Sequence, residues 1–463
     1  MNNLNFLVDV LKESPVFKTL EKNVKPGRTV CASGLSTINK SNIIYALCRL
    51  KGVTAFCLAS DEKEAQTLCN DLSCMGLRAY VYPVRDFNFL DFQSRSHEYE
   101  HARLKVLLKL LNHECDVAIA CVDAAAQLTV PRNVLEQSVI EFEEGRELSL
   151  EKATKALTLL GYERFDAVEG SGQFSLRGGI LDFFMPDSDY PVRCEFWGDE
   201  ITDLSYFDIE TQRRFKKADK ITLSPSTEIV IEDRAALADK IEHKAKLLRS
   251  KNSVKAKEKL FSEAELIRSG AMIANADKFI NQIYDKPESL FDYLDRNTLV
   301  FASEFTAIQE RGKSMDFISN ETLMQGFEDG TLCRGFDRFA LTFNECTEFL
   351  QSHGTIVLEN FVHGSMPIKL SEIISFSTKQ LSAWGGSYKQ LKEDVDGLFT
   401  PESKGVIFAG TERAAKNLCD TFNADGINAV YSEGADKISK GELLVMQGAL
   451  SAGFEYPSQK FFA

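Results

Sequence analysis

The stretch of chain that most limits the possible folds lies between residues 173 and 215. It reads QFSLRGGILDFFMPDSDYPVRCEFWGDEITDLSYFDIETQRRF, and two turn signals, Gly178-Gly179 and Gly198-Asp199, separate its short apolar runs. From Val192 to Trp197, apolar residues alternate with a cation, an anion and an indole. One face of such a strand can enter a core while the other faces outward. The stretch therefore predicts an antiparallel sheet that buries one face.

The outward face of this predicted sheet carries Arg177 and Arg193, which have no obvious local structural duty. Arginines in this position suit a surface that docks a partner. The alternative is an ordinary solvated face with incidental arginines. Residue types alone favour that alternative, because charged side chains usually belong to solvated faces.

Three segments within the stretch resemble, in order, a module shared by the excision-repair protein UvrB and the bacterial transcription-repair coupling factors. They are RGGILDFF from Arg177, VRCEFWGDEI from Val192 and FDIETQR from Phe207. A match over about forty residues is far less prone to chance than a six-residue motif. The coupling factors are the closer match.

This resemblance implies that the module binds UvrA, the damage-recognition ATPase of excision repair. The residues that it implies for the contact are Arg164 and Arg177 foremost, with Arg193 and Phe184 behind them. UvrB-like sequences tend to have further arginines where this chain has Ser171 and Ser175, so details of the contact are expected to differ. Phe184 has a core alternative, because its alternation with Ile180 and Asp182 does not fix which face is buried.

The fold implied is a multidomain α/β chain, with a degenerate helicase-like (RecA/UvrB-like) parallel-sheet domain, an inserted α+β docking module and a further small α/β domain. Alternating strand and helix patterns support the parallel sheet, with strands expected at 29–33, 53–59, 79–82 and 117–122. The expected parts are 1–127 (UvrB-like domain 1A), 128–212 (the inserted UvrA-binding module), 213–350 (domain 1B, packed with 1A), and 351–463 (a linker and small domain 3). By the same resemblance the chain is a fragment that stops before the polymerase-interacting and translocase domains.

The first domain contains a sequence similar to a phosphate loop with one residue changed. The working motif places glycine directly before a Lys-Ser pair, so that backbone amides wrap the phosphates and the lysine meets them. Here Gly34 opens the motif, but Asn39 precedes Lys40 and Ser41. Asparagine tolerates left-handed backbone geometry, so the loop is expected to keep its shape while the Asn39 side chain intrudes where a phosphate would lie.

The carboxylates that would accompany ATP hydrolysis are not evident. Asp123 ends an apolar stretch without an adjacent glutamate, and Asp61-Glu62 reads as the start of a helix. We therefore expect an inactive loop and no catalytic residues in this chain. The alternative is a nucleotide-dependent DNA-acting enzyme, UvrB-like or helicase-like, that tolerates Asn39. In the resembling family, ATP and Mg²⁺ serve a C-terminal motor, so no cofactor is expected here.

Charge and cysteine spacing narrow the classes of partner and site. A formal charge of -14 argues against a nonspecific coat on nucleic acid, although a basic stretch runs from Lys240 to Lys259. A solvated helical face is the default reading of that stretch, with DNA contact as the lesser hypothesis. The closest cysteine pairs lack the two-residue gap of zinc sites, so no metal is expected.

The sequence shows neither an apolar run of bilayer length nor a secretion signal, so a cytoplasmic protein without a membrane partner is expected. The favoured hypothesis is a noncatalytic region that recruits UvrA to stalled RNA polymerase and regulates an ATP-driven translocase on duplex DNA. That translocase would lie in the full-length protein, outside this chain.

Overall fold

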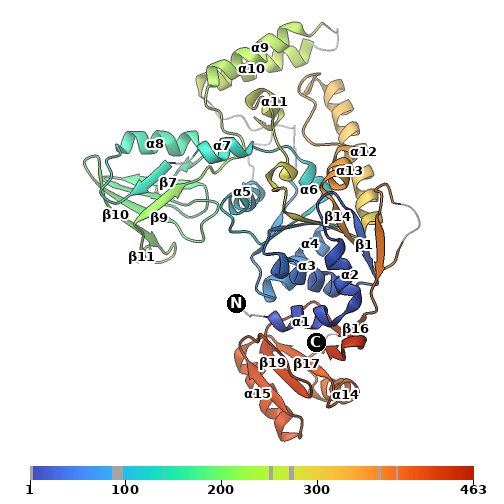
Figure 1. The fold of residues 1–463 in the computed structure, drawn as a ribbon. Coiled ribbons are helices and arrows are strands. Elements are labelled where there is room, and N and C mark those ends of the chain that lie inside the picture. The colour runs from blue at the N-terminus through green and yellow to red at the C-terminus, as the bar shows by residue number, and fades with distance from the viewer. Residues whose placement is uncertain are drawn as a thin grey trace.

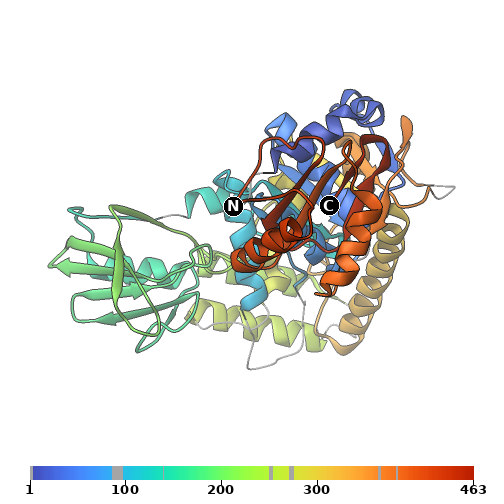
Figure 2. The ribbon, with the colours of Figure 1, turned by 90° about the horizontal axis from the view of Figure 1, so that it is seen from below.

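The computed structural model describes residues 4–85, 97–138, 140–249, 254–270, 276–362, 366–381 and 384–463. It shows a mixed α/β chain with several sheets, in agreement with the expected multidomain fold. In Figures 1 and 2 a mostly antiparallel module extends to one side of a central parallel-sheet domain, and in Figure 1 the last domain lies beneath that centre. No helix in these ranges is long and apolar enough to span a bilayer.

The central domain is built on a seven-stranded sheet of order β15-β1-β14-β13-β2-β4-β3, in which every described pair is parallel. Its strands are β1 (Val30–Ser33), β2 (Ala55–Ala59), β3 (Ala79–Tyr82), β4 (Val117–Cys121), β13 (Leu299–Ser303), β14 (Thr355–Leu358) and β15 (Glu372–Ser375). The four strands expected before residue 127 are confirmed. β1, β2 and β4 are buried at every position, as is typical of parallel strands covered on both faces.

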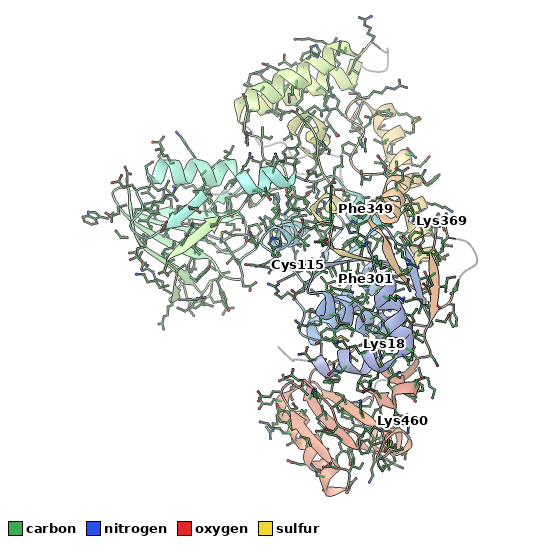
Figure 3. The ribbon with its side chains drawn as sticks, in the orientation of Figure 1. Lys18, Cys115, Phe301, Phe349, Lys369 and Lys460 are labelled. Carbon is green, nitrogen blue, oxygen red and sulfur yellow. The ribbon has the colours of Figure 1, made fainter. Side chains whose placement is uncertain are left out.

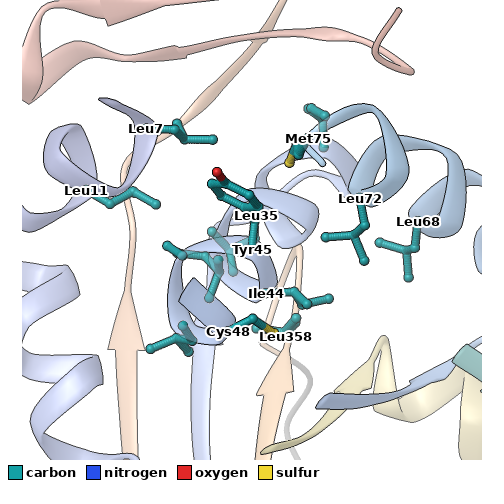
Figure 4. Close-up of a cluster of buried hydrophobic side chains, with 14 of the residues drawn as sticks. Leu7, Leu11, Leu35, Ile44, Tyr45, Cys48, Leu68, Leu72, Met75 and Leu358 are labelled. Atoms are coloured by element: carbon teal, nitrogen blue, oxygen red, sulfur yellow. The ribbon is translucent and has the colours of Figure 1, made fainter. Parts of the chain in front are cut away.

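Helices cover both faces of this sheet. One face packs against α1 (Asn5–Glu13), α2 (Pro15–Asn23), α3 (Thr37–Lys51) and α4 (Glu62–Cys74), and the other against α5 (Glu98–Leu111), α6 (Val122–Ala126), α12 (Phe305–Asp329) and α13 (Phe343–His353). Side chains fill the space around Phe301 of β13, which is fully buried (Figure 3). On the first face, Leu7 and Leu11 of α1 lie near Tyr45 of α3 (Figure 4).

The parallel sheet continues past residue 350, where the sequence analysis places the start of the last part. β14 and β15 both pair with β1, Val30 lying opposite Ile356 on one side and Glu372 on the other. Strand partners so far apart in sequence are set by tertiary pairing, which a local apolar pattern does not specify.

The module contains a six-stranded sheet of order β11-β10-β9-β8-β7-β6. Its strands are β6 (Glu163–Arg164), β7 (Gln173–Arg177), β8 (Ile180–Phe183), β9 (Val192–Trp197), β10 (Glu200–Phe207) and β11 (Arg214–Lys217). One face packs against α8 (Leu150–Leu159), whose N-terminus is capped by Ser149 accepting from the Lys152 N–H. A short helix, α7 (Arg132–Gln137), precedes β5 (Ile140–Glu143), which pairs with β12 (Lys220–Leu223) beyond the expected limit at residue 212.

A buried ion network joins the module to the central domain where the chain enters and leaves it. Arg103 of α5, which has no exposed surface, donates from Nε to Oε1 of Glu228 at 2.6 Å, and Glu228 is equally buried. The hydroxyl of Thr129 donates to the other Glu228 oxygen at 2.6 Å, and the Arg103 guanidinium lies 4.2 Å from the centre of the Tyr82 ring. Thr129 lies before β5 and Glu228 after β12, so this network holds together the two chain segments that connect the module to the central domain.

After the module, α9 (Arg234–Leu247) and α10 (Val254–Ser269) form a helical hairpin (Figure 1). Short helical turns follow at Ala276–Phe279, Ile280–Ile283 (α11) and Leu290–Tyr293. Several lysines of the basic stretch have protein partners: Lys240 pairs with Asp285, Lys246 with Glu242, and Lys244 donates to the Gly335 carbonyl. Contact of this stretch with DNA stays a prediction.

The last domain is a second α/β unit, with a six-stranded sheet of order β16-β20-β21-β17-β19-β18. Its elements are β16 (Lys379–Leu381), α14 (Tyr388–Leu398), β17 (Lys404–Ala409), α15 (Glu412–Ala424), β18 (Ala429–Ser432), β19 (Glu442–Gln447), β20 (Gly453–Tyr456), a turn at Pro457–Gln459 and β21 (Phe461–Phe462). Thr411 caps α15 by accepting from the Ala414 N–H. Its apolar residues share one core cluster with α1 and α3, so the two domains pack directly together.

Candidate partner-docking site

The outward face of the module sheet is organised in two cross-strand rows. Strand pairing places Arg177 opposite Ile180, Ile180 opposite Glu195, and Glu195 opposite Asp203. The neighbouring row runs through Ser175, Asp182, Arg193 and Ser205. Residues between these rows, such as Leu181 and Cys194, are buried in the core with α8. The alternation read from the sequence is therefore confirmed on these central strands.

Asp182 connects the two arginines that the sequence singled out. Its carboxylate is 1% exposed and accepts from Arg193 Nε at 2.7 Å, from Arg193 Nη2 at 2.8 Å and from Arg177 Nη2 at 3.1 Å. Hydrogen bonding to Asp182 raises the pKa of Arg193, whereas burial alone would lower it. The Arg193 guanidinium also lies 4.4 Å from the centre of the Phe207 ring. Arg193 is thus held by the sheet itself.

Most of the N–H donors of Arg177 remain available to a partner. Its side chain is 53% exposed, against 12% for Arg193, and its bond to Asp182 uses one of the five N–H donors of a guanidinium. Of the two arginines that the structure brings together, Arg177 is therefore the one available to a partner.

Arg164 and Phe184 lie apart from this arginine pair. Arg164 is exposed on the edge strand β6, in register with Phe174, so it is one residue out of step with the row that contains Ser175. Within the described residues its side chain makes no hydrogen bond or ion pair. Phe184 is half-buried just after β8, and its backbone N–H donates to the Gln173 carbonyl.

The phosphate-loop sequence is helical from Thr37 onward, which corrects the expectation that the loop keeps its shape. Helix α3 begins at Thr37, so Asn39, Lys40 and Ser41 all lie in its first turns. Gly34 does adopt a left-handed φ of +78°, but a Cβ there would meet the Phe376 carbonyl oxygen at 2.2 Å. The turn is packed against the end of β15, where the motif would need space for a phosphate.

Lys40 is satisfied by carboxylates of the protein. Its side chain is 2% exposed, and Nζ lies 2.6 Å from Glu304 Oε1, 3.2 Å from Glu64 Oε1 and 2.9 Å from Ser303 Oγ. Burial raises the pKa of Glu64, but the charge of Lys40 and hydrogen bonds from Ser303 and Ser60 outweigh it and lower that pKa. The lysine that would meet a phosphate therefore balances internal negative charge.

The last domain closes the same end of α3. Asn39, Ser41 and Asn42 are fully buried, and the Asn42 amide donates to the Tyr456 hydroxyl of β20 at 3.1 Å. Ser41 donates to Asp71 at 3.2 Å, and Asp71 also accepts from the backbone N–H and the hydroxyl of Ser451, both at 2.8 Å. Protein atoms thus occupy the region that a bound nucleotide would need.

Glu359, a buried acid beside Glu304 and Lys40, makes the free energy of unfolding depend on pH. Burial raises the pKa of Glu359 to about 7, with the Phe305 N–H opposing the rise and the Glu304 carboxylate adding to it. A glutamate in an unfolded chain titrates near about 4.3, so the folded chain binds this proton more tightly. The stability that it contributes is present below about pH 4 and is lost as the pH rises through about 7.

Glu359→Gln is therefore expected to be more stable than wild type at pH 8, by on the order of 2–3 kcal/mol, and to gain little at pH 4. Urea unfolding of both proteins at the two pH values measures the difference. The control is Glu151→Gln, since Glu151 is an exposed carboxylate whose pKa is lowered by its hydrogen bond with Lys155. A Glu359→Gln gain that is equal at both pH values would contradict the shift.

A separate pocket of about 740 Å³ lies in the last domain, between α14 and the carboxyl ends of β17 and β19. Trp384, Leu391, Phe408 and Phe462 line it, with Glu393 and Asp394 among its polar residues. Apolar walls with carboxylates do not suit a nucleotide phosphate. In the described ranges, no group of three or more His, Cys, Asp or Glu side chains could hold a metal ion.

Sequence reasoning placed the indole of Trp197 on the outward face, but it missed the role of Asp182 and the exposure of Tyr190 and Phe215. Trp197 is 82% exposed, and Tyr190 and Phe215 are about half exposed and pack edge-on with ring centres 4.7 Å apart. The alternation in the sequence did place Asp182 on the face of Arg177. Only the register between β8 and β9 shows that it binds Arg193.

Comparison with known proteins agrees with this structure. The UvrB interaction domain family matches residues 140–229, which cover β5 through β12. The chain is 26% identical to the transcription-repair-coupling factor of Bacillus subtilis over 97% of its own length and 39% of the relative. The corresponding protein of Staphylococcus epidermidis is 25% identical over 82% of this chain and 32% of the relative, and that of Staphylococcus aureus 22% over 98% and 39%.

The chain thus spans at most about two fifths of the length of these relatives. The resemblance to transcription-repair coupling factors, first read from three short segments, is confirmed along nearly the whole chain, and the module matches the UvrB interaction domain.

Proposed function

We propose that this chain, which is similar to transcription-repair coupling factors, binds UvrA through its module and brings it to stalled RNA polymerase. The observation that carries the proposal is the match of residues 140–229 to the UvrB interaction domain, on a sheet that presents Arg177 to solvent. Arg164 and Phe184 are the further contact residues, and Arg193 supports the surface through Asp182.

Under this proposal the chain performs no catalysis of its own. The burial of Lys40 among Glu64, Glu304 and Ser303 supports a scaffold role for the former nucleotide domain. ATP, Mg²⁺ and duplex DNA then belong to a translocase outside this chain, which the chain regulates. The competing function is a nucleotide-dependent DNA-acting enzyme.

Arg177→Ala is expected to weaken UvrA binding about 10- to 30-fold, because arginines in interfaces are frequent hot spots. Titration of purified UvrA against the chain, with and without ATP, measures this. The matched control is Arg146→Ala, which removes an exposed arginine that pairs with Glu141 elsewhere on the module. That control should bind within about twofold of wild type.

Two results would overturn the proposal. One is a wild-type chain that does not bind UvrA, and the other is binding that Arg177→Ala and Arg164→Ala both leave unchanged. ATP turnover by the chain above background, abolished by Lys40→Ala, would support the competing enzyme.

A further inference from the structure

Trp197 is the most exposed large hydrophobic side chain of the described residues, at 82%. Indole side chains carry a large apolar area and are usually well covered. In the described part of the chain Trp197 makes no ring contact, whereas Tyr190 and Phe215, at the Val192 end of the same sheet, cover each other. The exposure of Trp197 therefore needs an explanation that its own fold does not supply.

The backbone holds this indole firmly. Trp197 is the last residue of β9, a central strand between β8 and β10, and it pairs with Glu200 across a turn in which Gly198 has a φ of +64°. The preceding Phe196 N–H donates to the Gly179 carbonyl at 2.8 Å. A Cβ at Gly179 would lie 2.8 Å from the Phe196 carbonyl oxygen, so the turn between β7 and β8 packs closely against this end of β9.

Trp197 and Arg177 share one corner of the sheet face. Along β9, Arg193, Glu195 and Trp197 point to the same side, and Glu195 is in the row of Arg177. Two strand spacings separate β7 from β9, and Trp197 lies two residues beyond Glu195, so the backbones at Arg177 and Trp197 are about 12 Å apart. An arginine and an indole at that separation can be covered by a single partner.

Some charges around this corner are paired within the sheet, whereas Asp199 and Glu200, in the turn after Trp197, are exposed. Arg214 bonds to both Glu195 and Asp203, and Asp182 binds Arg193 and Arg177. The corner therefore offers one apolar group and one partly free cation, with the exposed carboxylates of Asp199 and Glu200 in the adjoining turn. A surface that fits it has an apolar pocket beside a carboxylate.

We propose that Trp197 is the apolar anchor of the docking surface and fills a pocket on UvrA next to the carboxylate that meets Arg177. This rests on the proposed function. Tryptophan and arginine are the side chains that most often dominate interface energies, and a rigid strand position lowers the entropy lost on binding.

The test compares two Trp197 variants and one control variant of the full chain with wild type. Trp197→Ala is expected to weaken UvrA binding at least about 10-fold, and Trp197→Phe to weaken it less. The control is Tyr190→Ala, which removes an exposed aromatic side chain from the far end of the sheet and should bind within about twofold of wild type. Because Trp197 is exposed, the two Trp197 variants should keep the wild-type melting temperature.

A second measurement reports on the indole itself. The chain has two tryptophans, so Trp384→Phe made with 5-fluorotryptophan carries a single fluorine reporter at position 197. Unlabelled UvrA should shift or broaden its ¹⁹F resonance. An unchanged resonance, with Trp197→Ala binding as wild type while Arg177→Ala is weakened, would overturn the anchor and leave the proposed function standing. Absence of wild-type binding would overturn both.

Discussion

Lys40→Met is expected to lower the free energy of unfolding by about 3–5 kcal/mol, because it removes one partner of a buried ion cluster. Methionine fills a similar volume but leaves Glu64 and Glu304 side by side without their shared cation. Urea unfolding followed by far-UV circular dichroism measures the loss. Lys51→Met, on the same helix, is the control: Lys51 is 35% exposed and 3.9 Å from Glu21, so its loss should cost less than about 1 kcal/mol.

A double variant separates charge from packing. If uncompensated negative charge causes the loss, adding Glu64→Gln to Lys40→Met should recover part of it, and the two changes should be less than additive. Equal stability of Lys40→Met and wild type, together with a loss of ATP binding, would instead identify Lys40 as a phosphate-binding lysine. The same pair of variants therefore tests both readings of the former phosphate loop.

The start of helix α3 shows why the geometry of the phosphate-loop sequence could not be predicted from the sequence alone. The order of Gly34, Asn39, Lys40 and Ser41 follows the spacing of a phosphate loop, and nothing local in it reveals a helix from Thr37. The partners that fix this geometry come from far along the chain: the Phe376 carbonyl against Gly34, and Glu304 against Lys40. A local pattern contains no information on such contacts.

The strands were easier to predict, for a physical reason. Parallel strands covered on both faces, such as β2 and β4, are short continuous apolar runs, and alternation marks a half-buried strand such as β9. Which strands pair with one another was harder to predict than where the strands lie in the sequence. The addition of β14 and β15 to the sheet of β1 depends on tertiary packing, which is why the limit expected at residue 350 falls before two of its strands.

The outward face of the module sheet could be predicted in part, less well than the strands and better than the phosphate-loop sequence. Alternation placed Arg177 and Arg193 on one side, but their different availability depends on Asp182, which binds Arg193 in two places and Arg177 in one. Sequence could name both arginines as candidates. It could not show that one is held by the sheet and the other is free to meet a partner.

Glu228→Ala is the second change expected to have a large effect, with a loss of about 3–5 kcal/mol in the free energy of unfolding. Arg103 is fully buried, so removal of the carboxylate that it meets at 2.6 Å strands a guanidinium in the protein interior. Thr129 loses its acceptor at the same time. Glu228→Gln keeps an acceptor oxygen but not the charge, so its loss should be smaller.

Glu228→Ala should also loosen the attachment of the module, because Thr129 and Glu228 lie at its two chain crossings. Limited proteolysis should then cut near these crossings faster than in wild type, while UvrA binding through the intact sheet changes little. Glu151→Ala, which breaks an exposed pair with Lys155, provides the baseline and should unfold at the same urea concentration as wild type. If Glu228→Ala matches that baseline in both assays, the network does not hold the module in place, and packing between the two units must do so.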